Sequence, residues 1–102
     1  MIICIESDGC VVTDADTLTD LRVLSSITGA SSLDEVARAV GIGTAGEGHV
    51  FADVERLRAL AKESATLEDW DEQFDGMIGY ARARGWLSED GRAVRAHVDR
   101  SA

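Results

Sequence analysis

The chain has 102 residues, 45% of them apolar and 28% charged, and a formal net charge of −9. This length predicts a single domain over residues 1–102, and the apolar fraction argues against intrinsic disorder. The negative charge disfavours binding to nucleic acid or to an anionic membrane, because both depend on cationic side chains. It suits a basic protein partner instead.

The N-terminus lacks the basic segment of a signal peptide, and no apolar run reaches the length of a membrane span. We therefore expect a cytoplasmic protein, and the abundance of arginine, alanine and glycine suggests a bacterial source.

Two short strands are predicted first, Ile2–Glu6 and Cys10–Thr13, joined by an Asp-Gly turn. Both are apolar on both faces, so we expect central positions in a sheet. The registers that this turn allows place Cys4 and Cys10 badly for a disulfide, so buried, reduced thiols are expected.

Two helices are predicted next. The first shows apolar residues at a spacing of three, namely Leu18, Leu21, Leu24 and Ile27. It runs to about Thr28 and ends at Gly29. The second begins near Ser32, which has Glu35 at capping-box spacing, and ends at Gly41.

The segment Gly41–Gly48 holds four of the ten glycines and is interpreted as a flexible connecting loop. It matches the pattern G-x-G-x-x-G, but it follows a helix and leads into a strand. Dinucleotide binding needs the opposite order, so no cofactor is predicted. Gly43 and Gly46, together with His49, remain candidate ligand-binding residues of a lid or contact loop.

The second half of the chain begins with a predicted strand, His49–Ala52, and Asp53 then caps a helix. Thr66 is expected to cap a long amphipathic helix over Leu67–Arg84, and a glycine stops it. A hairpin over Trp86–Val98 completes the chain. These elements predict an α+β fold: a small antiparallel sheet from the N-terminal hairpin, one middle strand and the C-terminal hairpin, packed with about four helices.

The long helix and the Trp86–Val98 hairpin resemble the end of a winged-helix domain, in which the helix reads the major groove and the hairpin is the wing. The resemblance implies a DNA-binding regulator. The first turns of this helix carry five acidic residues, however, where such a helix contacts bases and phosphates. This alternative is therefore disfavoured.

His49 and His97 are the only histidines, and their spacing matches no metal-binding motif. A nucleophilic Cys4 or Cys10 with a histidine base is chemically feasible, but nothing in the spacing favours it. Other nucleophile motifs are absent from the sequence. We therefore predict no metal, and the sequence leans against an enzyme.

Gly76 and Gly79 interrupt the long helix, and together with Ala83 they form a line of small residues at spacings of three and four. Each glycine costs about 1 kcal/mol relative to alanine at an exposed helical position. Three explanations stay open: close packing on the chain's own sheet or helices, a contact with a second copy of the chain, or a ligand groove beside Tyr80.

The leading functional hypothesis is a non-enzymatic interaction or accessory domain that self-associates as a homodimer. The first alternative is a small-molecule-binding module or minor enzyme that uses the Gly41–Gly48 loop and His49. The second alternative is the winged-helix-like regulator.

Overall fold

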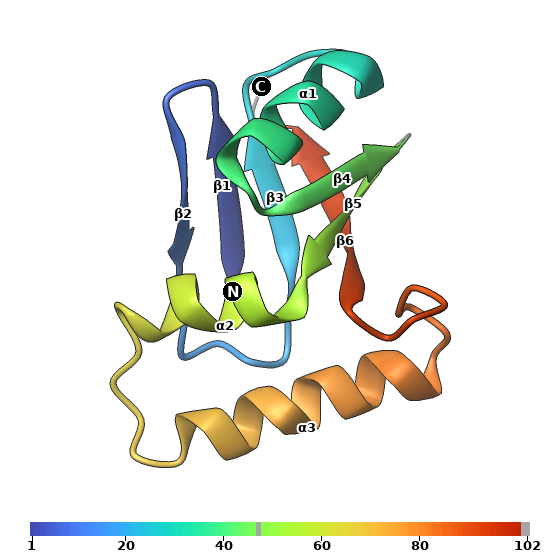
Figure 1. Ribbon diagram of the computed structural model, residues 1–102. Coiled ribbons are helices and arrows are strands. Elements are labelled where there is room, and N and C mark those ends of the chain that lie inside the picture. Colours follow the sequence, from blue (N-terminus) through green and yellow to red (C-terminus); the bar gives the residue numbers. More distant parts are fainter. Residues whose placement is uncertain (47, 101–102) are drawn as a thin grey trace.

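The computed structural model describes residues 1–46 and 48–100 (Figure 1). Within these residues, the strands are Ile2–Glu6 (β1), Gly9–Thr13 (β2), Arg22–Ser25 (β3), Gly43–Gly46 (β4), His49–Asp53 (β5) and Ala93–Arg100 (β6). The helices are Ala30–Val40 (α1), Val54–Lys62 (α2) and Trp70–Ala83 (α3). The predicted α+β class is confirmed, whereas three described helices replace the four that were expected.

The six strands form one sheet in the order β2-β1-β3-β6-β5-β4. β3 runs parallel to both of its neighbours, β1 and β6, and the other neighbouring pairs are antiparallel. The predicted antiparallel sheet is therefore wrong, because the sheet is mixed. The physical reason is β3, an unpredicted strand that lies between the two predicted hairpin regions.

β1 and β2 form the predicted N-terminal hairpin, although its two-residue loop starts one residue earlier than expected. Glu6 pairs with Gly9, and Cys4 pairs with Val11. In this register Cys4 and Cys10 lie on opposite faces of the sheet, and both are free and half-buried. β2 is an edge strand, so the expectation of two central strands is correct only for β1.

The predicted helix over Leu18–Thr28 is wrong, because this segment forms a loop followed by β3. Val23 and Ser25 are buried in the alternation of a strand. The Ser25 hydroxyl donates to the Ile5 carbonyl of β1 over 2.6 Å. The amino group of Met1 donates to two carbonyls of the loop, over 2.7 and 2.8 Å. These contacts with distant residues outweigh the helical spacing of the leucines.

The segment Gly41–Gly48, interpreted above as a flexible loop, contains β4 instead. Gly41 ends α1 with a φ of 80°, as predicted, and β4 then pairs with β5. A Cβ atom at Gly43 would lie 1.9 Å from the carbonyl oxygen of Phe51, so this close strand contact requires glycine. Glu47, in the same segment, lies outside the described residues.

The starts of the first two helices differ in how they are capped. α1 begins at Ala30 after Gly29 and has no side-chain cap, so the capping box predicted at Ser32 does not form. α2 is capped as predicted, because the Asp53 carboxylate accepts a hydrogen bond from the Arg56 amide over 3.0 Å.

α3 begins at Trp70, three residues later than predicted. Thr66 does not cap it, because its hydroxyl and amide both donate to the Asp16 carboxylate, over 2.5 and 2.9 Å. The helix ends at Ala83, and Gly85 follows with a φ of 76°, which matches the predicted glycine stop.

The hairpin predicted over Trp86–Val98 forms in part, over Trp86–Arg95, where the Ser88 amide donates to the Ala93 carbonyl and the Arg95 amide to the Trp86 carbonyl. Leu87 and Val94 form a single bridge, and β6 then pairs with β5 on one side and β3 on the other. β6 is therefore an interior strand and does not project as a wing. Its alternation is as predicted, with Arg95 and His97 exposed on one face.

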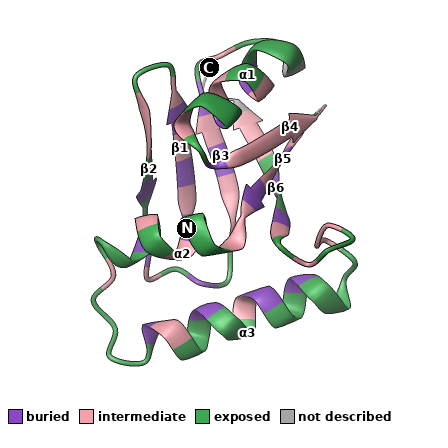
Figure 2. Ribbon diagram, viewed as in Figure 1, coloured by how far each residue is buried: buried purple, intermediate pink, exposed green. Residues whose placement is uncertain are grey.

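One face of the sheet is covered and the other is largely open. α1 and α2 lie against the covered face, and α3 runs across one end of the strands (Figure 1). Figure 2 shows that the buried residues of α3 lie on its side toward the sheet. The buried strand residues on the covered face include Ile3, Ile5, Val12, Val23, Val50, Ala52, Val94 and Ala96. Their neighbours along each strand face outward and stay at least partly exposed.

Candidate functional site

A groove of about 660 Å³ lies between α3, the loop that joins β2 to β3, and the start of β6. α3 contributes one flank, with Gly76, Met77 and Tyr80 among its lining residues. Leu21 lines the groove from the loop, and Trp86 lines it from the segment between α3 and β6. The groove therefore joins segments that are far apart in the sequence.

Two aromatic side chains dominate the wall of the groove. Tyr80 and Trp86 meet edge to face, with their ring centres 5.9 Å apart. Tyr80 is 54% exposed, because the buried stripe of α3 runs through Trp70, Phe74, Ile78 and Ala81 and leaves Tyr80 on the flank. The Arg84 guanidinium lies 5.0 Å from the centre of the Tyr80 ring. The groove thus offers an accessible aromatic surface with a cation at its edge.

A smaller polar hollow of about 310 Å³ adjoins this groove. Leu21, Trp86 and Arg95 line both spaces, and His49 and His97 line the polar hollow. The two spaces are therefore adjacent, with the apolar groove under α3 and the polar hollow over β5 and β6.

The two histidines occupy directly opposite positions on neighbouring strands. His49 of β5 is the register partner of His97 of β6. The Val98 amide donates to the Gly48 carbonyl over 3.0 Å, which makes the histidine pair a non-hydrogen-bonded pair. Side chains at such pairs approach each other more closely than at hydrogen-bonded pairs. Both histidines line the polar hollow, and the His49 imidazole lies over Gly46 of β4.

The imidazole of His49 is held by its own neighbours. It meets the ring of Phe51 edge to face, with centres 5.1 Å apart. On the other side, a Cβ atom at Gly46 would lie 3.1 Å from His49 Nε2. Glycine at position 46 therefore leaves space for the imidazole.

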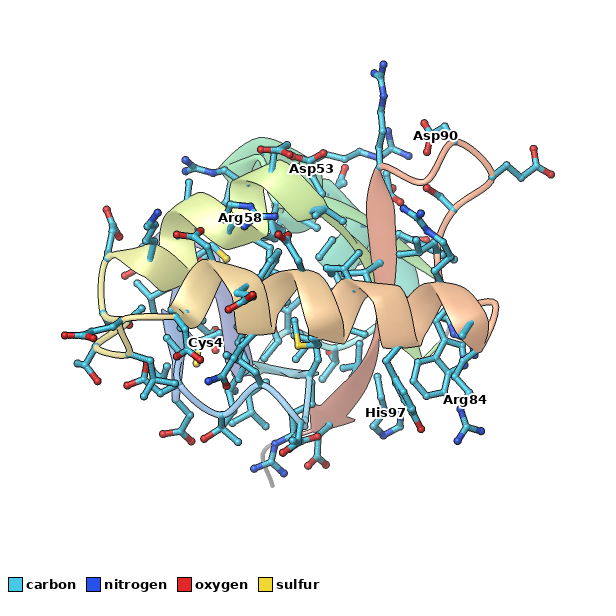
Figure 3. All side chains as sticks on the ribbon, turned by 90° about the horizontal axis from the view of Figure 1, so that it is seen from below. Cys4, Asp53, Arg58, Arg84, Asp90 and His97 are labelled. Atoms are coloured by element: carbon cyan, nitrogen blue, oxygen red, sulfur yellow. The ribbon has the colours of Figure 1, made fainter. Side chains whose placement is uncertain are left out.

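Charge is distributed unevenly along the site. Of the described residues that line the polar hollow, none is acidic, although the chain carries a net charge of −9. The apolar groove has one acidic lining residue, Asp20, which lies 3.8 Å from the Arg22 guanidinium. Figure 3 shows His97 and Arg84 on one side of α3 and Arg58 on the other. The polar hollow is thus a locally cationic surface on an acidic protein.

Among the described residues, neither a cluster of metal ligands nor a cysteine nucleophile lies in the groove or the polar hollow. Among the described residues, no three side chains of His, Cys, Asp or Glu come together as metal ligands would. Cys4 and Cys10 line neither of the two spaces. Burial raises the pKa of the Cys10 thiol, which opposes formation of the nucleophilic thiolate.

The structure divides the residues singled out from the sequence into three groups. Tyr80 and Gly76 line the apolar groove, and His49 lines the polar hollow. Gly43 and Gly46 belong to β4 and line neither space. Gly79 and Ala83 are exposed on α3, outside the lining of both spaces.

A Cβ atom built at Gly76 or Gly79 would meet no heavy atom within 4 Å. Close packing within the described chain, one of the explanations left open for these glycines, is therefore wrong.

Sequence reasoning missed the contribution of Trp86, Arg95 and His97 to this site. The alternation of β6 was a usable signal, because it places Arg95 and His97 on one exposed face. The pairing of β6 with β5 carried no such local signal.

Comparison of the chain with protein-family models, with curated proteins and with solved structures finds no match. Among the described residues, no helix has both the length and the apolar character needed to cross a membrane.

Proposed function

We propose that this protein is a non-enzymatic binding module that holds a small molecule with a flat apolar body in the groove between α3 and β6. The observation that carries this function is the continuous concave surface built around Tyr80 and Trp86. Its volume of about 660 Å³ falls within the range of small-molecule sites, roughly 300–1,000 Å³.

The chemistry of the lining supports binding. Tyr80, Trp86 and Met77 present rings and a thioether that stack on or surround an apolar ligand. Tyr80 is already exposed to water, so a ligand that covers it gains the free energy of removing apolar surface from solvent. The described residues that line the groove include no cysteine or serine nucleophile. Binding without a covalent step is therefore the simplest activity for this surface.

The two exposed glycines of α3 provide a matched test. Gly76 lines the groove, whereas Gly79 lies outside its lining on the same helix. Both positions are exposed on α3, and a Cβ atom at either one meets nothing within 4 Å. Both Gly76→Leu and Gly79→Leu are therefore expected to fold and to stabilise α3 slightly.

The probe is phenylnaphthylamine, an uncharged aromatic dye that fluoresces when it leaves water. We expect the natural chain to bind it, Gly76→Leu to weaken binding about tenfold or more, and Gly79→Leu to leave binding within about twofold. Absence of dye binding, or equal weakening by both substitutions, would overturn the proposed function.

Self-association is the second candidate function, and the edge strand β2 favours it. β2 has a neighbour on one side only, and its residues include no charge and no proline. Val11, at its centre, is 60% exposed. Natural edge strands usually carry a lysine, a proline or a bulge that prevents pairing with another chain. We propose that β2 pairs with β2 of a second copy.

Light scattering at high micromolar concentration tests the homodimer. A monomer of the natural chain would contradict it. If the natural chain is a dimer, Val11→Lys should yield a monomer, because a charge on the edge opposes strand pairing. Leu67→Lys, at a partly exposed position outside β2, is the control and should leave the dimer intact.

Gly79→Leu tests the other predicted interface, the line of Gly76, Gly79 and Ala83, because a large side chain there would keep a second backbone away. A basic protein partner, suggested by the negative charge, remains a separate prediction.

A further inference from the structure

We propose that the ligand of this groove is an organic anion, held with its charged group in the polar hollow at Arg95, His97 and His49 and its apolar body against Trp86 and Tyr80. This inference rests on the binding function proposed above and adds the chemical class and the orientation of the ligand.

The first support is the position of Arg95. It lines both the apolar groove and the polar hollow, as does Trp86. Arg95 and His97 are two residues apart on β6, so both side chains leave the same face of the strand. An anionic group at Arg95 is therefore adjacent to His97, while the part of the molecule attached to it reaches the indole of Trp86.

The second support is the charge of the surroundings. Within the described part of the chain, Arg95 forms no ion pair, whereas Arg22, Arg38 and Arg58 each do. His97 is exposed beside it. A guanidinium can donate two parallel hydrogen bonds to a carboxylate, sulfonate or phosphate, and the imidazole N–H groups add donors to the same anion. Leu21 and Trp86 add apolar surface to the wall of the same hollow, and charge-assisted bonds are stronger beside such surface than in bulk water.

The third support is the position of Asp20, which favours one orientation of an anionic ligand in the groove. Asp20 lines the apolar groove and does not line the polar hollow. An anion that entered with its charge toward Asp20 would meet repulsion, whereas the opposite orientation brings the charge to Arg95. The site therefore favours one orientation of an amphipathic anion.

A pair of dyes separates this inference from the proposed function. Anilinonaphthalene sulfonate has the ring system of phenylnaphthylamine and an added sulfonate. Titration of both dyes into the natural chain should show the sulfonate bound about tenfold more tightly, because charge-assisted hydrogen bonds form only with it.

Arg95→Gln should remove most of this preference and leave the affinity for phenylnaphthylamine within about twofold. Arg95→Lys should retain part of the preference, because it keeps the charge but loses the bidentate geometry. His97→Gln should reduce the preference less than Arg95→Gln does. The control is Arg92→Gln, which makes the same change in net charge at an exposed arginine outside both spaces. Circular dichroism and urea unfolding confirm that each variant is folded.

Three results of these titrations would overturn one or both proposals. Binding of the neutral dye with no preference for the sulfonate overturns the anion inference and leaves the proposed function standing. A preference that Arg92→Gln reduces as much as Arg95→Gln also overturns the inference, since net charge then explains it. Failure of both dyes to bind overturns both.

Discussion

The two flanks of α3 differ in what covers them. The flank toward α2 is closed by charged groups: Arg58 pairs with Asp71 over 3.1 Å and also with Asp75, and Lys62 pairs with Asp71 over 2.6 Å. The Arg58 guanidinium also lies 4.6 Å from the centre of the buried Phe74 ring. On this flank, the charged side chains of α2 and α3 that meet are paired with one another.

The flank toward β6 is open. Tyr80 is more than half exposed, and Gly76 leaves the space beside it unfilled. The same helix therefore places its paired charges where it contacts α2 and its accessible aromatic surface where the groove runs. The first flank is therefore covered by paired charges of the chain itself, whereas the second leaves aromatic surface exposed, which is where we propose that a ligand binds.

Truncation of the core residue between these flanks should have the largest effect. Phe74 is fully buried and stacks on Trp70, with ring centres 5.0 Å apart. Phe74→Ala should lower the free energy of unfolding by about 3–5 kcal/mol, because it leaves a cavity. Urea unfolding followed by circular dichroism measures this loss, and Phe74→Leu gives a milder version if the alanine variant fails to fold.

Tyr80→Ala is the counterpart on the open flank. It should change the free energy of unfolding by less than about 1 kcal/mol and weaken binding of phenylnaphthylamine. A loss of stability as large as that of Phe74→Ala would remove the distinction between the flanks.

Removal of the cation on the closed flank should have the next largest effect. Arg58→Met keeps the apolar stem but loses both ion pairs and the contact with the Phe74 ring, so we expect a loss of roughly 1 kcal/mol. The difference should shrink at high salt, which screens exposed charges. Arg56→Met, at an exposed position of the same helix, is the control. Equal losses for the two variants would show that the ion pairs contribute nothing.

Gly79→Ala should stabilise the chain by about 0.5–1 kcal/mol, because alanine favours an exposed helix and a Cβ atom meets nothing there. Thermal unfolding of a dilute sample measures the gain. A loss of stability that grows with protein concentration would instead indicate that Gly79 contacts a second copy of the chain.

Acid should weaken the closed flank by the smallest amount. The Lys62 ammonium and, to a lesser extent, the Arg58 guanidinium lower the pKa of Asp71 in the folded chain. The stability that Asp71 contributes is therefore complete above the pKa of the unfolded chain and is lost as the pH falls through the lower pKa of the folded chain.

The natural chain should have a higher urea midpoint than Asp71→Asn at neutral pH. This difference between the two chains should be smaller at about pH 3. A difference between the two chains that grows as the pH falls would contradict this assignment.

Much of the local structure could be predicted from the residues themselves. The N-terminal hairpin, α1, α2, α3 and β5 were identified, because alternation and helical spacing depend on a few neighbouring side chains. Gly41 and Gly85 ended their helices as expected, because the left-handed backbone that each adopts suits a residue without a Cβ atom.

The candidate site could be predicted only in part. Gly76, Tyr80 and His49 were named from the sequence, but the structure distributes them over two adjoining spaces. Arg95 and His97 could be placed on one face of a strand, yet nothing local indicated that His97 pairs with His49 in the sheet.

The rest depended on contacts between distant residues. The leucines of residues 18–24 fit a helix as well as a loop and strand, and the choice came from pairing with β1 and from the Ser25 hydrogen bond to Ile5. Likewise, the groove exists because the loop before β3, the flank of α3 and the start of β6 meet in space. Periodicity, capping and turn chemistry act over a few residues, so they can be recognised in the sequence. Strand order and concave surfaces arise from the packing of the whole chain.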